Sequence, residues 1–521
     1  MAGKFIWDAV LHRTSEQTLT IHNPQQVPTT LYAREDVPIE KAGVQQLLRF
    51  LSLQDTLMKL YDDERKGEIG PFFGDMPGLL EQVVLTPDFH KGGGIPIGTV
   101  AKTKGCIIPQ AVGNDICCGM RLLVTDLKRS DLEPHLDTLE PQLRGIFFEG
   151  KRHLPMSPRQ RKALLQEGLW GVLETCTDNQ NKGLWSYYDT TRQEKDLERV
   201  HFQGVLPAQG TFAFDDYIKA SGKTDSYDAQ LGSIGGGNHF VEVQVVEDIL
   251  DGSAAHEWGV SPDSIVIMVH SGSIGLGHTV GRHFLDKARE IYPKHLAHPE
   301  HGFYVLPTHG PHSQLAKDYW DAMSNAANFA FGNRLFLGLM AVRALSEVVG
   351  KRVESSLVYD APHNLIWDET RNQNGYVHRK GACPAYGPQP EMSCSNAYLG
   401  KPVIIPGSMG ASSYLLSGSG NQEALNSACH GAGRSLPRGQ SRKVDEDVYQ
   451  ETFSTLRVVT PIDPNDPKLR GRHDILDKYH QHLKEEAPFA YKSVTSVVQT
   501  VAEAEIANQV ARLWPLMTVK G

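Results

Sequence analysis

The sequence predicts one large domain of mixed helices and strands, and three observations support this prediction. Short apolar runs recur along the chain and lead into glycine-rich turns, as buried strands do. Longer segments between them repeat apolar residues at helical spacing. The glycine-ended strands are scattered from residue 83 to residue 410, so a site assembled from them requires a single interleaved fold.

The predicted strands are Val83–Leu85, Ile107–Ile108, Arg121–Val124, Phe240–Val245, Ile265–Val269 and Val403–Ile405. The predicted helices are Lys41–Leu60, Arg159–Glu174 and Gln314–Gly350. Two other stretches have the character of insertions. Residues 151–230 are polar with weak periodicity, and residues 286–313 carry histidines among prolines, which we expect to form a solvated loop rather than a metal site.

Composition narrows the class of protein. The 521 residues are 40% hydrophobic and 22% charged, which is typical of a globular chain and excludes disorder, collagen and coiled coils. The usual domain size of about 100–200 residues suggests three units, but the scattered strands favour a single domain over residues 1–521, with 151–230 as an insertion. The net charge of −9 excludes a polybasic nucleic-acid binder, although a local basic groove is still possible.

The expected location is the cytoplasm, without a membrane anchor. No apolar run approaches the roughly 20 residues that span a bilayer, and the N-terminus lacks the apolar region of a secretion signal. Seven cysteines form a sparse and odd set, which favours a reducing compartment over a disulfide scaffold.

Several motifs carry side chains suited to binding metal. GNDICCGMR (residues 113–121) offers Asp115 and Cys118, a hard and a soft ligand, and a thiolate can bridge two cations. Considered alone, this motif is better explained by a buried cysteine pair in a tight turn, with Cys117 pointing elsewhere. His239, His270 and His363 each lie at a strand end or glycine turn, where a core histidine is the alternative.

Two further motifs suit phosphate chemistry. PGSMGASSY (residues 406–414) is a turn that could bind a phosphate or a base edge. CHGAGR (residues 429–434) places His430 beside a flexible turn and three arginines spaced by four, Arg434, Arg438 and Arg442. Guanidinium groups match phosphate geometry, although a solvated helix face is the alternative.

Together these motifs indicate a dinuclear centre. Five metal-capable side chains exceed the four ligands of a closed zinc site: Asp115, Cys118, His239, His270 and His363. They fit two divalent ions roughly 3.5–4 Å apart, the arrangement that acts on phosphoryl groups.

From about Val83 to Lys520, the chain resembles the RtcB-type RNA ligases. PDFHKGGGIPIGTV, GNDICCG, GGGNHFVEVQ, HSGS-GLGH, HN, PGSMG-SSY and HGAGR occur in the family's order. The resemblance implies a single α+β domain with layered sheets around a deep metal cleft flanked by helices. It also implies ligation of RNA 2′,3′-cyclic-phosphate or 3′-phosphate ends to 5′-hydroxyl ends with GTP and two Mn²⁺ per chain, with an archease-type helper as a possible partner.

The resemblance also assigns roles to residues. The implied metal ligands are Asp115, Cys118 (bridging both ions), His239, His270 and His363. The implied nucleophile, which becomes guanylylated, is His430, and Asp88 orients it. The residues implied to hold the nucleotide are Asn238, Glu242, Asn364, Ser408, Ser413, Arg434, Tyr491 and Lys520. Glu242 could accept from guanine N1–H and N2–H and thereby reject adenine. Lys520 requires the C-terminus, which ordinarily frays, to lie in the cleft.

The chain departs from the family pattern at three positions: Ile274 replaces the usual arginine of the HSGS-GLGH motif, Cys117 an asparagine, and Pro362 a frequent cysteine. Ile274 cannot grip an RNA phosphate, which leaves an alternative open: an end-processing enzyme that opens cyclic phosphates or caps 3′-phosphates without joining. A non-catalytic RNA-binding descendant is a third possibility, against which the intact metal-capable residues and His430 argue.

Overall fold

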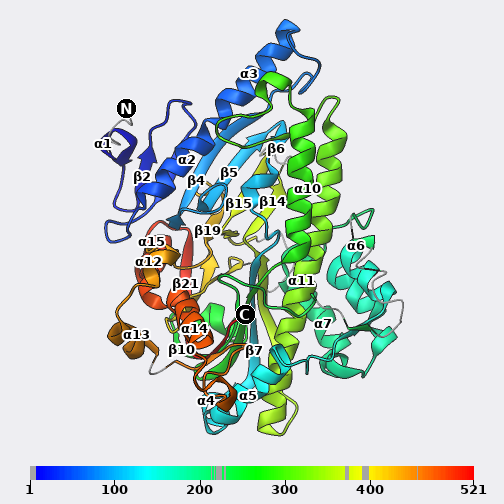
Figure 1. Ribbon diagram of the computed structural model, residues 1–521, viewed down its shortest axis with the longest axis vertical. Helices are drawn as coiled ribbons and strands as arrows, with labels where there is room; N and C mark the ends of the chain where they lie inside the picture. The colour runs from blue at the N-terminus through cyan, green and yellow to red at the C-terminus, as the bar shows by residue number, and fades with distance from the viewer. Residues whose placement is uncertain are drawn as a thin grey trace.

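Two large sheets form the framework of the computed structural model (Figure 1). The structure describes residues 7–212, 214–215, 218, 226–227, 230–369, 375–389, 398–453 and 456–521. In Figure 1 the two sheets lie one above the other along the long axis, and α10 and α11 run together beside them, with α6 and α7 on the far side of α11. Three two-stranded sheets complete the described β structure.

The seven-stranded sheet has the order β1-β2-β3-β4-β5-β15-β14. Its strands are β1 (Leu11–Arg13), β2 (Thr18–Ile21), β3 (Thr29–Tyr32), β4 (Leu79–His90), β5 (Ile97–Lys104), β15 (Tyr376–Lys380) and β14 (Asn364–Asp368). All its pairings are antiparallel except that of β3 with β4.

The eight-stranded sheet has the order β13-β7-β11-β10-β21-β18-β17, with β20 added beside β21. Its strands are β13 (Ser355–Pro362), β7 (Gly119–Lys128), β11 (Ser264–Ser271), β10 (Phe240–Ile249), β21 (Ala507–Val519), β18 (Ser413–Gly418), β17 (Pro402–Ile405) and β20 (Val458–Val459). The small sheets pair β12 (Leu306–Pro307) with β6 (Cys106–Ile107), β16 (Ala382–Pro384) with β19 (Ser427–Cys429), and β8 (Pro155–Met156) with β9 (Ser226–Tyr227).

Helices cover the sheets. The α-helices are α1 (Trp7–Val10), α2 (Lys41–Leu51), α3 (Leu53–Lys66), α4 (Arg129–Leu132), α5 (Leu136–Phe147), α6 (Pro158–Thr175), α7 (Thr190–Asp196), α9 (Gly252–Glu257), α10 (Gly275–Ile291), α11 (Ser313–Val349), α12 (Arg438–Ser441), α13 (Glu446–Phe453), α14 (His473–Glu486) and α15 (Val494–Glu503). The 3₁₀ turns are η1 (Pro109–Val112), η2 (Glu133–His135), η3 (Cys176–Asn179), η4 (Gly183–Tyr187), η5 (Leu197–Arg199), η6 (His201–Gly204), η7 (Lys294–Leu296), η9 (Pro467–Leu469) and η10 (Pro488–Ala490).

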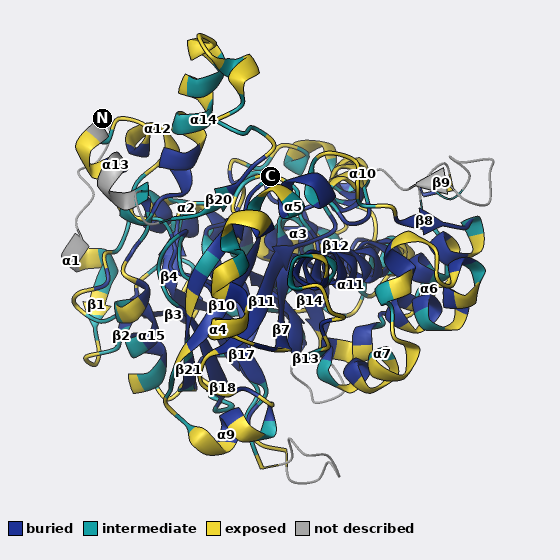
Figure 2. Cartoon of the chain, turned by 90° about the horizontal axis from the view of Figure 1, so that it is seen from below, coloured by how far each residue is buried: buried dark blue, intermediate teal, exposed yellow. Residues whose placement is uncertain are grey.

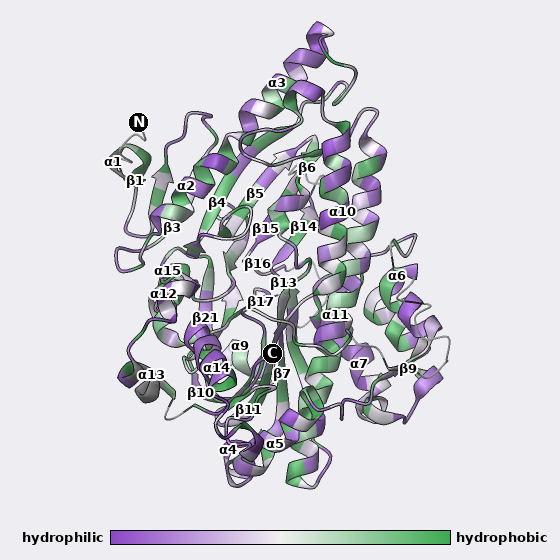
Figure 3. Ribbon diagram, viewed as in Figure 1, coloured by the Kyte–Doolittle hydropathy of each residue, from purple (hydrophilic) through white to green (hydrophobic). Residues whose placement is uncertain are grey.

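Helix α11 is buried at the centre of the molecule (Figure 2). From Ala322 to Val342 every residue is buried, which is the pattern of a helix that packs on all sides. Hydrophobic side chains concentrate on the strands of both sheets and on α11, whereas α6, α9 and α14 expose more of their residues (Figures 2 and 3). Within the described parts of the chain, no helix has the length and apolar character needed to cross a membrane.

The mixed α+β fold with layered sheets is confirmed, and every predicted strand overlaps an observed one. The predicted helix Lys41–Leu60 is instead two helices, α2 and α3. They meet at Ser52, whose hydroxyl donates to the carbonyl of Arg49 at 2.8 Å. A serine that bonds its own backbone in this way competes with continuation of the helix.

The two stretches predicted as insertions contain regular structure. In residues 151–230, α6 is interrupted at Gly168, which adopts a φ of 57° and lies so close to Gly204 that a Cβ would meet its carbonyl oxygen at 2.1 Å. This break explains the weak periodicity of the sequence. Residues 286–313 are only partly the predicted solvated loop, because α10 extends to Ile291 and His301 is buried with its Nε2 2.8 Å from Thr56 Oγ1.

Candidate functional site

The predicted metal ligands come together because their strands are neighbours in the eight-stranded sheet. Across that sheet Pro362 pairs with Gly119, Ser271 with Gly119, and Phe240 with His270. The strands alternate in direction, so the end of one lies beside the start of the next. The turns that carry the ligands therefore meet at one edge of the sheet.

The five side chains form a continuous cluster. Asp115 Oδ2 lies 2.9 Å from His239 Nε2, and Cys118 Sγ lies 3.2 Å from the same nitrogen. Cys118 Sγ is 3.3 Å from His270 Nε2, which in turn is 3.3 Å from His363 Nε2. The sulfur sits at the middle of the cluster, as a shared ligand would. We call these five residues the donor cluster.

The chemistry of the donor cluster fits a divalent cation. His239 Nδ1 is 2.9 Å from the carbonyl oxygen of Ile234, so the ring hydrogen lies on Nδ1 and the Nε2 lone pair faces Asp115 and Cys118. Asp115 Oδ2, which faces His239 Nε2, is buried without a hydrogen-bond partner. Acceptor atoms that face one another in this way repel unless a cation lies among them.

Burial controls protonation in the donor cluster. It lowers the pKa of His270 and of His363 well below the usual value, which keeps both imidazoles neutral and able to coordinate. Burial and then the charge of Asp115 raise the pKa of the Cys118 thiol well above the usual value. A cation at this position would take the place of the thiol proton, so metal binding and proton release are coupled.

His430 lies beside the donor cluster and is held by Asp88. His430 Nδ1 is 2.6 Å from Asp88 Oδ2, and the His430 ring centroid is 4.7 Å from that of His363. Asp88 is fully buried and also accepts from the Thr86 hydroxyl. Burial opposes ionisation of Asp88, but the charge and hydrogen bond of His430 outweigh it and lower its pKa. Nδ1 is therefore engaged with a carboxylate, and in the neutral ring, with its hydrogen on Nδ1, Nε2 is available as a nucleophile.

Close backbone approaches explain two glycines of the motifs. Gly433 adopts a φ of 74°, and a Cβ there would lie 2.2 Å from the carbonyl oxygen of Asp88. A Cβ at Gly272 would lie 2.6 Å from the carboxylate of Asp115. Any side chain at either position would displace an acid on which the site depends.

A cavity of about 660 Å³ opens beside His430 and reaches the donor cluster at Asp115 and His270. The predicted nucleotide residues that line it are Asn238, Glu242, Asn364, Ser408, Arg434, Tyr491 and Lys520. Ser413 lies behind this wall, fully buried, where its hydroxyl accepts from Gln244 Nε2 at 3.0 Å and from the amide of Gly407 at 3.1 Å. Their roles in nucleotide binding stay predictions.

The C-terminus lies in the cavity, as the position of Lys520 requires. Strand β21 runs between β10 and β18, and Lys520 follows it at 4% exposure. Its Nζ donates to the carbonyl of Gly237 at 2.6 Å, and burial lowers its pKa. Glu242 lies on the adjacent strand, accepts from Thr518 and Gln244, and has its pKa raised to about 7 by burial.

Sequence reasoning missed two charged residues that line the cavity outside the glycine motifs, Lys380 and Glu486. Lys380 donates to the carbonyls of Gly93 and, at 2.8 Å, of Ile95. Glu486 accepts from the Tyr491 hydroxyl and lies within 4.0 Å of basic nitrogens of three side chains: Arg434, Arg438 and Lys520. Neither residue belongs to a glycine motif, and no local pattern distinguishes them from surface charges.

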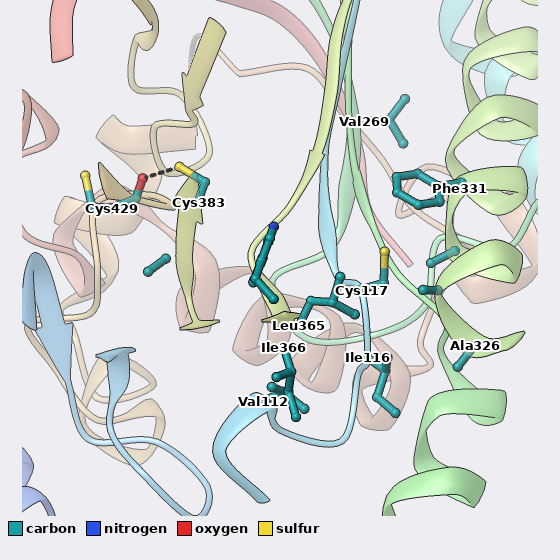
Figure 4. Packing of buried hydrophobic residues seen from close by; sticks show 14 of the residues in the cluster. Val112, Ile116, Cys117, Val269, Ala326, Phe331, Leu365, Ile366, Cys383 and Cys429 are labelled. Atoms are coloured by element: carbon teal, nitrogen blue, oxygen red, sulfur yellow. Dashed lines mark hydrogen bonds between the residues drawn. The ribbon is translucent and has the colours of Figure 1, made fainter. Parts of the chain in front are cut away.

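The departures from the family pattern are also located. The Ile274 side chain packs on the apolar core, with a methyl group facing Gly235, and its amide donates to Asp115 Oδ1 at 2.8 Å. Cys117 lies in the apolar packing near Phe331 of α11 (Figure 4), and its Sγ is 3.9 Å from Arg334 Nη2. Of the three arginines, Arg434 and Arg438 line the cavity, whereas Arg442 is half exposed and pairs with Glu485.

Comparison with known proteins shows the family of this chain. A family model described as tRNA-splicing ligase RtcB matches residues 73–521. The tRNA-splicing ligase RtcB of Thermococcus kodakarensis is 33% identical over 90% of this chain and 93% of its own length. The RNA-splicing ligase RtcB of Mycobacterium bovis is 33% identical over 86% of this chain and 98% of its own, and the RNA-splicing ligase RtcB homolog 1 of Entamoeba dispar is 33% identical over 86% and 80%. This chain belongs to the RtcB family.

Proposed function

We propose that the protein is an RNA ligase that joins 2′,3′-cyclic-phosphate or 3′-phosphate ends to 5′-hydroxyl ends through a GMP adduct on His430. One observation carries the proposal: an imidazole oriented by a buried carboxylate stands 4.7 Å, ring to ring, from a member of a five-residue donor cluster. The names of the relatives, which are RNA-splicing and tRNA-splicing ligases, support the substrate class.

The chain's own residues supply the nucleophile and its orientation. Asp88 holds the Nδ1 hydrogen of His430, so the Nε2 lone pair attacks the α-phosphorus of GTP. A nitrogen–phosphorus bond forms as the bond to pyrophosphate breaks. The donor cluster would hold two divalent cations, proposed to be Mn²⁺, which supply charge neutralisation at the phosphates.

Two transfers then return the histidine to its starting state. An oxygen of the RNA 3′-phosphate attacks the phosphorus of the adduct, and the nitrogen–phosphorus bond breaks to release His430. The 5′-hydroxyl next attacks the RNA 3′-phosphorus, loses its proton and displaces GMP. A cyclic end first needs one water molecule to open it to the 3′-phosphate. Each step thus exchanges one bond at phosphorus for another.

Glu242 and Lys520 give the proposed guanine preference. Glu242 on β10 and Lys520, which directly follows the adjacent strand β21, both line the cavity, and an ionised Glu242 could accept from guanine N1–H and N2–H together. Adenine would leave those acceptors unpaired, which costs about 1–3 kcal/mol for each buried polar group. The archease-type helper stays a prediction of the family resemblance.

A second candidate function is end processing without joining, and Ile274 is the observation that favours it. The arginine that the family places here would offer an RNA phosphate up to five donors, whereas the isoleucine side chain offers none and packs on the core. The protein would then open cyclic phosphates or leave RNA 3′-phosphates capped with GMP.

The test follows the label from α-³²P-GTP with Mn²⁺, and then adds RNA that carries a 3′-phosphate and a 5′-hydroxyl. We expect wild-type protein and His256→Ala, an exposed control on α9, to become labelled and to yield joined RNA. His430→Ala should do neither. Label that ends on unjoined RNA, or cyclic ends opened without GTP, would support end processing. No label on wild-type protein would contradict the ligase.

A further inference from the structure

Two polar residues in the middle of α11, Asn333 and Arg334, contact the turns that carry the donor cluster. Both side chains are fully buried in a helix that is otherwise largely apolar on this stretch. Burying an amide or a guanidinium group is costly unless hydrogen bonds and opposite charge satisfy it. The hydrogen-bond partners of Asn333 and Arg334 therefore show which parts of the structure these buried side chains hold together.

Asn333 uses its amide to tie two turns together. Its Oδ1 accepts from the amide of Gly232 at 2.8 Å, and its Nδ2 donates to the carbonyl of Ser233 and to the hydroxyl of Ser271, each at 3.0 Å. The Ser271 hydroxyl donates in turn to the carbonyl of Ile234 at 2.8 Å. That carbonyl is the one that orients His239, and Ser271 directly follows His270.

Arg334 joins the cysteine turn to the same place. Its Nη1 donates to the carbonyl of Cys117 at 2.6 Å and to that of Ser271 at 3.1 Å, so one nitrogen bonds the neighbours of Cys118 and His270. Its Nε donates to Asp360 Oδ1 at 2.9 Å, and the other oxygen of Asp360 accepts from Arg121 at 3.1 Å. Arg334 thus has its charge compensated and its remaining donors directed at two ligand-bearing turns.

The same helix carries a matched pair of residues that do not face the site. Asn325 and Asn328 are also fully buried, and each donates to the carbonyl of Leu165 at 2.9 Å. Their other partners are Gly210 and Leu206, which belong to residues 151–230. Helix α11 therefore holds two buried asparagine networks of similar chemistry, and only the one at Asn333 and Arg334 reaches the donor cluster.

We propose that Asn333 and Arg334 are positioning residues that hold the turns of Cys118, His239 and His270 at metal-binding separation. The inference rests on the metal site of the proposed function. Ligands must be held to within about 0.5 Å of their working geometry by such supporting contacts. Loss of a supporting hydrogen bond typically costs a metal site 10–100-fold in affinity or activity.

The test compares Asn333→Ala with Asn328→Ala in the full chain, without GTP or RNA. Mn²⁺ affinity is measured by electron paramagnetic resonance of the free ion, Co²⁺ geometry by the thiolate and ligand-field absorption bands, and folding by thermal unfolding. Both variants should lose stability, because each leaves buried carbonyls unpaired. Only Asn333→Ala should also lose affinity, by about 10–100-fold, and shift the Co²⁺ bands.

Equal metal affinity and equal Co²⁺ bands in the two variants would overturn the inference while leaving the proposed function intact. If wild-type protein bound neither ion, the metal site itself, and with it both proposals, would be overturned. Should Asn333→Ala fail to fold, Asn333→Asp keeps the size and the acceptor for Gly232 but replaces the donor with a second acceptor. The same loss of affinity in that folded variant is expected, and wild-type affinity would overturn the inference.

Discussion

The two walls of the cavity are held by different forces. The donor cluster sits on strand ends of the central sheet, backed by α11, and its supporting contacts are buried hydrogen bonds. The other wall, which we call the nucleotide wall, carries Arg434, Arg438 and Glu486. These residues lie on or beside the short helix α12 and at the end of α14, and the ion pairs of Arg438 are half exposed. Figure 2 shows buried strands at the centre and exposed residues on the first turns of α14, although Glu485 and Glu486 at the end of this helix are buried.

The donor cluster is therefore expected to be preformed, whereas the basic and acidic side chains of the nucleotide wall neutralise one another until a ligand binds. The geometry of the donor cluster depends on buried contacts that salt screens weakly, so it should exist before any ligand arrives. Glu485 and Glu486 already pair with the two arginines that line the cavity, Arg434 and Arg438, which a phosphate would need. A nucleotide must therefore exchange carboxylate partners for phosphate oxygens, which makes its binding sensitive to salt and to pH.

Replacing Cys118, the proposed shared ligand, should have the largest effect on the donor cluster. Cys118→Ser substitutes a hydroxyl that does not ionise near neutral pH for a thiol that a cation can deprotonate. We expect Mn²⁺ affinity to fall by at least about 100-fold, with GMP labelling lost. The measurement is equilibrium metal binding, with Cys106→Ser as a matched control because Cys106 is buried on β6 outside the cavity. Unchanged affinity in Cys118→Ser would refute the bridging role.

The next largest effect is expected where the two walls meet, at Asp88. Asp88→Asn allows the amide nitrogen to donate to His430 Nδ1, which moves the ring hydrogen to Nε2 and removes the nucleophilic lone pair. We expect the rate of GMP labelling to fall by about 10²–10⁴-fold, the usual contribution of such a proton-positioning group. Metal affinity should not change. A variant that loses metal and labelling together would show that the two walls are coupled rather than separate.

Much of the donor wall could be predicted from sequence, because its chemistry is local. Asp115, Cys118 and the histidines stand in short turns where glycines and strand ends are visible in the letters themselves. The sequence does not show which strand ends are neighbours in the sheet. In the order β13-β7-β11-β10, strand β7 lies between β13 and β11, each more than a hundred residues away in the sequence, and only packing of the whole sheet selects this order.

Asn333 and Arg334 could not be predicted as supporting residues, and the reason is physical. Asn333 and Arg334 lie in the run AANFAFGNRLFLG, where helical periodicity indicates core, and their partners are backbone atoms of distant turns. Strand β21 was also missed, because Pro515 interrupts its pattern. That proline lies at a register shift opposite Gln244, a place where a strand tolerates a missing donor.

Changing the pH should test the proposed role of Glu242, which lines the cavity from β10. Burial raises its pKa from 4.5 to about 7, against hydrogen bonds from Thr518 and Gln244 and the charge of Lys520. Guanine requires the ionised form, so guanosine affinity should rise about tenfold per pH unit up to about pH 7 and then level off. Calorimetric titration with guanosine, which has no phosphate to ionise, between pH 5.5 and about 8 tests this.

The same carboxyl group should affect folding with the opposite sign. Because its folded pKa exceeds its unfolded value of 4.5, the unfolded chain releases the proton first, so nucleotide-free protein should lose stability as pH rises from 4.5 to about 7. In Glu242→Gln both pH dependences should disappear from thermal unfolding and guanosine titration. A pH slope that survives the substitution would assign the titration to another group.

The smallest effects should come from the exposed ion pairs of the nucleotide wall. Arg438 and Arg442 both pair with Glu485 and are half exposed, but only Arg438 lines the cavity. Exposed pairs are worth about 0.2–1 kcal/mol, so the free energy of unfolding of both alanine variants should lie within about 1 kcal/mol of wild type.

Arg438→Ala should weaken GTP binding roughly tenfold, since a charge-assisted hydrogen bond contributes about 1.5–3 kcal/mol. Arg442→Ala should change it by less than about twofold. Raising the salt concentration from about 0.1 M to 1 M should reduce the difference in GTP affinity between the two variants. The Debye length falls to about 3 Å at 1 M, so most of the electrostatic contribution of the exposed Arg438 is screened. An equal loss in both variants would mean that the whole helix face, rather than the cavity wall, binds the phosphates.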